Sequence, residues 1–125
     1  MNKITEKLST VFTEKQINLL KDAWCYGSWG DAEVNFNGEE AWGLGACTND
    51  AKNGKRFNGR QVSGIMSGIA KRIRETGTNM IKSCPDWWGD GTGDMVFFNT
   101  DVLCADATVD GKEWEMLNEW SKSNE

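Results

Sequence analysis

The sequence contains no histidine, a single proline and no two cysteines at C-x-x-C spacing. Structural zinc sites are built from clustered cysteine and histidine ligands, so we expect no metal centre and no cofactor. The four cysteines, at positions 25, 47, 84 and 104, are widely scattered. We expect them to be free, buried thiols, with a disulfide between two of them as the alternative.

Long apolar segments are also missing. No run of about 18 apolar residues occurs, which predicts that nothing spans a membrane. Residues 1–7 (MNKITEK) lack the apolar core of a signal peptide, so the expected location is cytoplasmic. The 125 residues, 38% of them hydrophobic, are enough for one domain with its own core.

Catalytic motifs are absent as well. Without histidine, acid–base chemistry would depend on carboxylates or cysteine. No nucleophile elbow and no phosphate-binding glycine loop is present, so we predict that the protein is not an enzyme. A carboxylate pair for glycoside hydrolysis is the alternative. The Asp- and Gly-rich segment 86–94 does not match an EF-hand loop, and we predict no calcium site there.

The charge is unevenly distributed along the chain. The net charge is -5, from 14 basic and 19 acidic residues. Residues 51–82 nevertheless carry eight basic residues and only one acidic residue, Glu75. The remainder carries six basic and 18 acidic residues. Such asymmetry indicates a local anion-binding face on an acidic body, or else a solvated helix paired with acidic neighbours.

Helix signals mark the first half of the chain. Residues 1–11 look like a short helix or arm. A capping box formed by Thr13 and Gln16 predicts a helix from about residue 13 that ends near residues 25–27. Residues 32–36 alternate as in a short strand, followed by a turn at 37–38. A short helix is predicted from about 47 to 53, stopped by Gly54.

The clearest helix spans residues 58–76. Asn58 and Gln61 form a capping-box-like pair at its start, and Gly77 follows its end. The apolar residues recur at helical spacing and predict a core stripe, namely Val62, Ile65, Met66, Ile69 and Ile73. The opposite face combines basic and small residues. Gly64 and Gly68 are spaced so that they alternatively allow another helix to pack closely.

A β-hairpin and a final helix complete the pattern. Residues 78–84 and 95–98 read as strands joined by a loop rich in Gly and Asp. The last helix is predicted to begin near Asp110. Its inner stripe, Trp114, Leu117 and Trp120, is expected to pack on the helix that begins at residue 13, with a homodimer seam as the alternative. Whether the protein is a monomer or a homodimer stays open.

This order of elements resembles the winged helix-turn-helix superfamily, especially its small regulators and phage-type proteins. The segments that carry the resemblance are 13–24 as first helix, 47–53 as second helix, 58–76 as recognition helix and 78–98 as wing. The resemblance implies an α+β fold, winged helix-turn-helix-like, with a three-helix core, a β-hairpin wing and a C-terminal helix. One such domain would cover residues 1–125.

Double-stranded DNA is the partner that the resemblance implies, for a regulator of mobile-element or phage type. Arg60 and Gln61, at the start of the expected recognition helix, suit guanine and adenine edges. Ser63 and Ser67 would leave the helix surface low enough for close approach. The residues expected to contact phosphates are Lys52, Lys55, Arg56, Lys71 and Arg74.

A protein-interaction module on the same fold, such as an inhibitor or adaptor of a host protein, is the alternative. The expected wing carries Trp87, Trp88 and Asp90, a combination that suits a protein interface. We expect at least one of the two tryptophans to be buried. Carbohydrate binding through tryptophan is a weaker possibility, because two amphipathic helices are unusual in sugar-binding modules.

Overall fold

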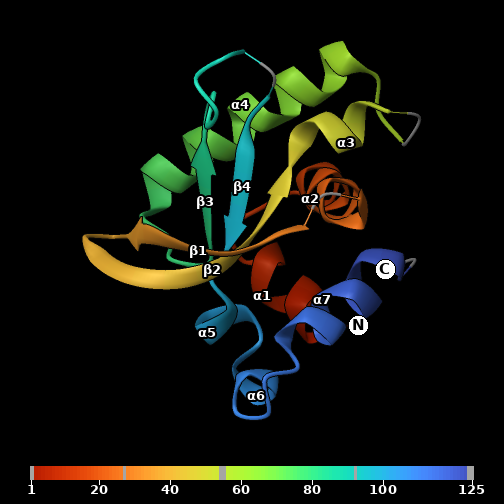
Figure 1. Cartoon of the computed structure of the whole chain (residues 1–125). Helices are drawn as coiled ribbons and strands as arrows, with labels where there is room; N and C mark the ends of the chain where they lie inside the picture. The colour runs from red at the N-terminus through yellow and green to blue at the C-terminus, as the bar shows by residue number, and fades with distance from the viewer. Residues whose placement is uncertain (1, 27, 54–55, 92, 124–125) are drawn as a thin grey trace.

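The computed structural model describes residues 2–26, 28–53, 56–91 and 93–123. It has a mixed α+β fold, as predicted, with several helices packed on one antiparallel sheet (Figure 1). The helices are α1 (Lys3–Ser9), α2 (Glu14–Tyr26), α3 (Thr48–Lys52), α4 (Gly59–Thr76), α5 (Thr100–Leu103), α6 (Ala105–Thr108) and α7 (Glu113–Lys122). The strands are β1 (Ser28–Phe36), β2 (Glu39–Cys47), β3 (Ile81–Cys84) and β4 (Met95–Phe98). Within the described parts of the chain, no helix is both long and apolar enough to cross a bilayer.

The sheet has the strand order β1-β2-β4-β3, with every neighbouring pair antiparallel. Asn37 and Gly38, both with positive φ (53° and 84°), form the tight turn between β1 and β2. The sequence predicts a short strand before this turn and assigns no element directly after it. In the structure β2 follows the turn at once and lies between β1 and β4.

Two glycines explain why β2 gives a weak strand signal. A Cβ at Gly43 would lie 2.6 Å from the backbone oxygen of Phe98, and one at Gly45 would lie 2.9 Å from the Phe97 ring. Glycine is poor in strands by intrinsic preference, yet here it permits a close approach of β2 to β4. The contacts that select glycine are long-range and are not visible in local sequence.

Helix α4 forms as predicted. The Asn58 side chain accepts a hydrogen bond from the Gln61 backbone N–H, and the Gln61 side chain accepts one from the Asn58 backbone N–H. Gly77 ends the helix in the left-handed region, with φ 63°. The buried side of α4 consists of Val62, Met66 and Ile69, with Ile65 and Ile73 half-buried beside them.

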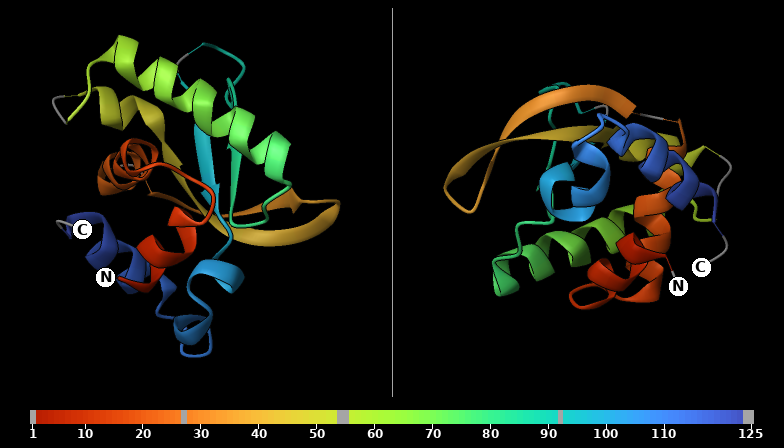
Figure 2. Two further views of the ribbon diagram at one scale, coloured as in Figure 1. Left: turned by 180° about the vertical axis from the view of Figure 1, so that it is seen from behind. Right: turned by 90° about the horizontal axis from the view of Figure 1, so that it is seen from below.

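Helix α2 also begins with a capping box. The Gln16 backbone N–H donates to the Thr13 hydroxyl at 3.2 Å, and the Gln16 side-chain oxygen accepts from the Thr13 N–H at 2.9 Å. Its apolar face lies in the main core, where Trp24 contacts Phe98 edge-on at 5.7 Å between ring centroids. Helices α2 and α4 lie on the same side of the sheet, away from the curled β1–β2 hairpin (Figure 2).

The C-terminal region differs from the prediction in where its last helix begins and in the short helices that precede it. The last helix begins at Glu113 rather than near Asp110, and no side chain caps it. Two short helices, α5 and α6, precede it and were not predicted. Leu117 and Trp120 are fully buried, and α7 packs against α2 as expected. Trp114, the third residue of the expected inner stripe, is instead 43% exposed, although its ring lies 5.2 Å from that of Trp24.

Candidate nucleic-acid interface

One face of α4 is uncovered along the whole helix. The residues on it are Arg60, Ser63, Gly64, Ser67, Lys71 and Arg74, all of them exposed. They recur every three or four residues, so they form one stripe opposite the apolar residues of α4. A Cβ added at Gly64 would meet no atom within 4 Å, which shows that no other element packs there. We call this set the α4 stripe.

Gly64 and Gly68 therefore do not together form a surface on which another helix packs. Gly64 lies on the open stripe, whereas a Cβ at Gly68 would lie 3.1 Å from the Gln16 side-chain nitrogen of α2. Gly68 alone faces another helix. The two glycines thus have different surroundings although they are one turn apart.

The charges on the α4 stripe are mostly unpaired. Within the described ranges, neither Arg60 nor Arg74 makes an ion pair. The Lys71 ammonium lies 3.8 Å from the Glu75 carboxylate, and both side chains are largely exposed. An exposed pair at this distance is worth little in water. The stripe therefore presents net positive charge to solvent.

Lys52 adds a further cation near the start of α4. It is exposed at the end of α3, and its side chain comes within 3.9 Å of where a Cβ on Gly59 would lie. Lys52 makes no ion pair with any residue whose placement is described. Lys55, the neighbouring candidate, lies outside the described residues.

Arg56 has a structural role although its side chain is 41% exposed. Its guanidinium lies 3.2 Å from the carboxylate of Asp22, a residue that is only 4% exposed. Its backbone N–H donates to the same carboxylate at 3.2 Å, and its guanidinium also donates to Asn18 of α2. The connection between α3 and α4 is thereby tied to α2. The charge of Arg56 is compensated, which makes it a weaker phosphate contact than the sequence suggests.

Gln61 is exposed but lies to the side of the α4 stripe. Its side-chain oxygen accepts the Asn58 backbone N–H at 2.9 Å in the capping box. A bidentate contact to adenine needs the oxygen and the nitrogen of the carboxamide together. That oxygen already has a donor, so Gln61 is less suited to reading a base than Arg60.

Aspartate side chains form hydrogen bonds within the loop between β3 and β4. The Asp86 carboxylate accepts the Gly91 N–H at 2.7 Å, and the Asp94 carboxylate accepts the Asp86 N–H at 2.9 Å. Backbone atoms of Asp94 and Thr48 are also hydrogen-bonded, which joins the end of the loop to the start of α3. These carboxylates organise the loop as hydrogen-bond acceptors.

Both tryptophans of this loop are exposed, so the expectation that at least one is buried is wrong. Trp87 is 44% exposed and Trp88 is 48% exposed. Trp87 contacts the Phe97 ring edge-on at 4.9 Å between centroids, at the margin of a second, smaller apolar cluster. That cluster is built by residues of β1, β2 and β4, and neither tryptophan belongs to it.

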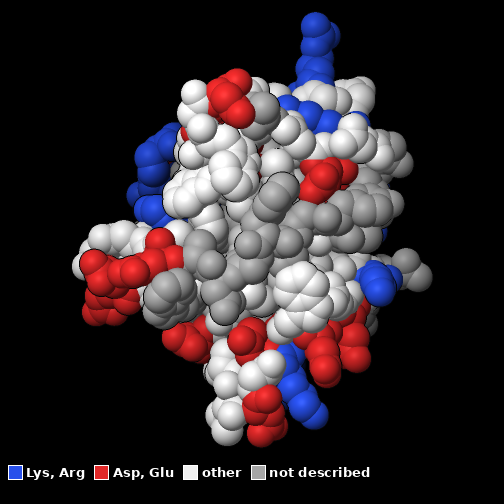
Figure 3. Space-filling model, viewed as in Figure 1, with Lys and Arg blue, Asp and Glu red and all other residues white. Residues whose placement is uncertain are grey.

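On the face shown in Figure 3, most basic and acidic side chains lie in different regions. Basic side chains appear along the upper rim of the molecule, where the two ends of α4 lie (Figure 3). Acidic side chains gather over the turn between β1 and β2 and over the region of α5–α7, with a further acidic group at the β3–β4 loop (Figure 3). On this face the segregation expected from the sequence is therefore partial, because a further acidic group lies in the upper half and basic groups lie at the right and the lower edge.

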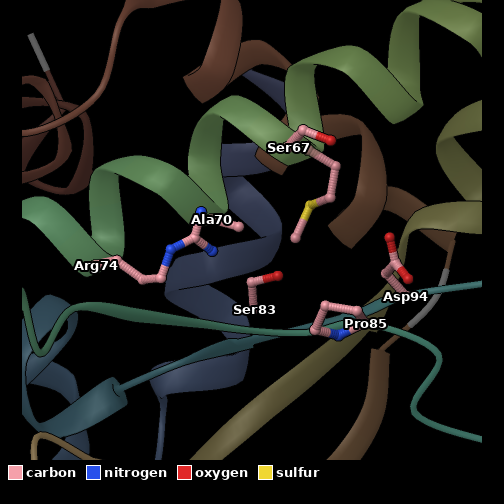
Figure 4. A pocket seen from close by; sticks show the side chains of 7 residues that line it. Ser67, Ala70, Arg74, Ser83, Pro85 and Asp94 are labelled. Atoms are coloured by element: carbon pink, nitrogen blue, oxygen red, sulfur yellow. The ribbon is translucent and has the colours of Figure 1, made fainter.

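A hollow of about 260 Å³ lies between the C-terminal half of α4 and the start of the β3–β4 loop. It is lined by Met66, Ser67, Ala70, Arg74, Ser83, Pro85 and Asp94. Arg74 lies at one end and Asp94 at the other, with Ser83 and Pro85 between them on the floor (Figure 4). The Ser83 hydroxyl is buried and has no hydrogen-bond partner among the described residues.

The described cysteine side chains offer no reactive group, and that of Cys25 lies outside the described residues. Cys47, Cys84 and Cys104 are free thiols, as expected. Burial raises the pKa of all three, and that of Cys104 to about 12. A thiol with a raised pKa is a poor nucleophile and a poor metal ligand at neutral pH.

The residues named from the sequence thus fall into separate groups. Arg60, Ser63, Ser67, Lys71 and Arg74 share one exposed face, and Lys52 lies near its start. Arg56 and Gln61 are engaged in local structure. Sequence reasoning missed Ser83 and Pro85, because only the fold brings them beside α4. Comparison with protein-family models, with curated proteins and with solved structures finds no match to this chain.

Proposed function

We propose that this protein binds double-stranded DNA through the α4 stripe, with a winged helix-turn-helix arrangement of α2, α3, α4 and the β3–β4 hairpin. In this arrangement α3 precedes α4 across a short connection, and the hairpin follows α4 directly. Strand β4 pairs with β2, which joins the hairpin to the rest of the sheet. The β1–β2 hairpin is then an addition between the first and second helices of the motif.

The observation that carries the proposal is the open, positively charged stripe on an otherwise acidic protein. The side opposite the stripe is buried, so α4 is held rigidly while its outer face stays accessible. A major groove about 12 Å wide admits one such helix. Ser63, Gly64 and Ser67 are small, which allows the backbone of α4 to approach base edges between the two arginines.

The position of each residue along α4 predicts whether it contacts bases or phosphates. Arg60 lies in the first turn, where a recognition helix reads bases, and its guanidinium suits guanine. Lys71 and Arg74 lie in the last turns and would contact phosphates, as would Lys52 beside the start of α4. The β3–β4 loop carries Asp86, Asp90 and Asp94. Because these carboxylates would be repelled by phosphates, the loop is expected to lie away from the DNA backbone.

Fluorescence polarisation with a labelled duplex of randomised sequence tests this proposal. At low salt, binding is expected at micromolar protein, and R60Q and R74Q are each expected to weaken it by about fivefold or more. K122Q removes an equal charge from α7 and serves as the matched control. Absence of binding, or an equal loss in K122Q, would overturn the proposal.

We infer a second candidate function, protein binding, from the two exposed tryptophans. Trp87 and Trp88 present large apolar surface beside aspartates, and such rings are typical interface anchors. The paired variant W87S/W88S is expected to lose a protein partner in affinity capture while DNA binding by polarisation stays unchanged. Loss of DNA binding in that variant would instead assign the loop to the DNA interface.

A further inference from the structure

We propose that the hollow between α4 and the β3–β4 loop is a binding site for a small, elongated zwitterion, with a carboxylate at one end and an ammonium group at the other. The coupling of this site to DNA, argued below, rests on the proposed function; the site itself does not.

The hollow has opposite charges at its two ends. The Arg74 guanidinium lies at one end and makes no ion pair with any described residue. The Asp94 carboxylate lies at the other end, and its Oδ1 accepts the Asp86 N–H at 2.9 Å. A carboxylate placed at Arg74 would gain a charge-assisted hydrogen bond, and an ammonium at Asp94 would gain another.

The walls between these ends are mainly apolar. Met66 and Ala70 of α4 and Pro85 of the loop are the apolar residues among those that line it. An unbranched chain of methylene groups fits such walls, whereas a simple anion would leave them in water and would be repelled by Asp94. The volume of about 260 Å³ is slightly below the range of drug-sized pockets, so the ligand is small.

The Ser83 hydroxyl gives an independent sign that a polar ligand belongs here. It lines the hollow, yet its oxygen is buried and has no partner among the residues described. A buried hydroxyl without a hydrogen bond carries a free-energy cost in the empty protein. A carboxylate held by Arg74 could accept a hydrogen bond from Ser83 as well, which would remove that cost.

Occupation of the hollow would also affect the α4 stripe, because Ser67 and Arg74 belong to both. A ligand carboxylate would neutralise Arg74 and withdraw it from phosphates. Ligand and DNA would then compete, and the protein would release DNA when the zwitterion accumulates. By reciprocity, DNA would weaken ligand binding by the same factor.

Calorimetric titration of the full chain with 6-aminohexanoate tests the site directly. Hexanoate and hexylamine, which keep the chain and one charge each, are the comparison ligands. Saturable binding of 6-aminohexanoate at millimolar concentration is expected, with affinity at least about tenfold above that of either comparison ligand. No binding, or equal binding of hexanoate, would overturn the proposal.

Variants separate the site from general effects on folding. R74Q and D94N are expected to weaken 6-aminohexanoate by about tenfold or more, while K71Q, on the α4 stripe but outside the hollow, is expected to bind it normally. S83A is expected to bind ligand more weakly although the unliganded protein becomes no less stable to urea. Normal ligand binding by R74Q would contradict the assignment.

The two proposals fail in different ways. If 6-aminohexanoate binds and no DNA binds, the site stands and the proposed function falls. If DNA binds and calorimetry detects no 6-aminohexanoate, the function stands and the site falls. If both bind, 6-aminohexanoate should raise the Kd for DNA in the wild type, and in D94N the same rise should require a concentration of 6-aminohexanoate that is higher by about tenfold or more.

Discussion

The carboxylate of Asp22 accepts the backbone N–H of Arg56 and pairs with its guanidinium, each at 3.2 Å. Asp22 is almost fully buried on α2, whereas Arg56 lies in the connection between α3 and α4. One carboxylate therefore fixes the entry of the chain into α4.

Replacement of Arg56 should destabilise the fold. R56A leaves the buried Asp22 carboxylate without its charged partner, and we expect a loss of about 1–3 kcal/mol in the free energy of unfolding. Urea denaturation followed by tryptophan fluorescence measures this loss. R60A removes an exposed arginine that makes no ion pair with a described residue, so it is the control and should change stability by less than about 0.5 kcal/mol. Equal stability of the two variants would contradict the assigned role of Arg56.

The two glycines of α4 should respond differently to alanine. G64A adds a methyl group in open space and should stabilise the helix by about 0.5–1 kcal/mol. G68A places a Cβ 3.1 Å from the Gln16 side chain, whose oxygen caps α2. Displacing that side chain offsets the gain, so G68A should be less stable than G64A in the same urea assay. The reverse order would show that α2 and α4 are not packed as described.

Gly43 should not tolerate any side chain. A Cβ there would meet the Phe98 backbone oxygen at 2.6 Å, so β2 and β4 would have to separate. G43A is expected to lose about 1–3 kcal/mol in thermal or urea unfolding. G38A, in the exposed turn, differs because its cost comes from a positive φ and not from a clash. A fully stable G43A would contradict the register of β2 on β4.

Cys104 should be the least reactive of the three described thiols. Burial raises its pKa from the ordinary 9.0 to about 12, so the folded protein holds it as a neutral thiol. Its contribution to stability is complete below pH 9 and is lost as pH rises toward 12, because only the unfolded thiol ionises in that interval. Alkylation by iodoacetamide near pH 8, read by peptide mass spectrometry, should modify Cys104 more slowly than Cys84. Equal rates would contradict its burial.

The sequence predicts those elements whose signals are local. The capping boxes at Thr13 and Asn58, the turn at Asn37–Gly38 and the left-handed Gly77 each depend on neighbours within four residues, and all are present. Strand β2 was missed because its glycines are selected by contacts with Phe97 and Phe98, which are more than fifty positions away. Helices α5 and α6 are too short to show a periodicity.

The candidate site was predicted only in part for the same reason. Helical spacing alone places Arg60, Ser67, Lys71 and Arg74 on one face of α4. It does not show that Asp22 compensates Arg56 from α2, or that Ser83 lies beside α4. Those relationships depend on how separate elements pack, which spacing within one element does not reveal.

The dependence of DNA affinity on salt is the most direct test of the α4 stripe. Each phosphate neutralised should contribute about -0.9 to the slope of log K against log salt concentration. With Lys52, Lys71 and Arg74 as phosphate contacts, the wild-type slope should lie between roughly -2 and -4, and K71Q should reduce its magnitude by about 1. A slope near zero, or the same reduction in K122Q, would contradict the account.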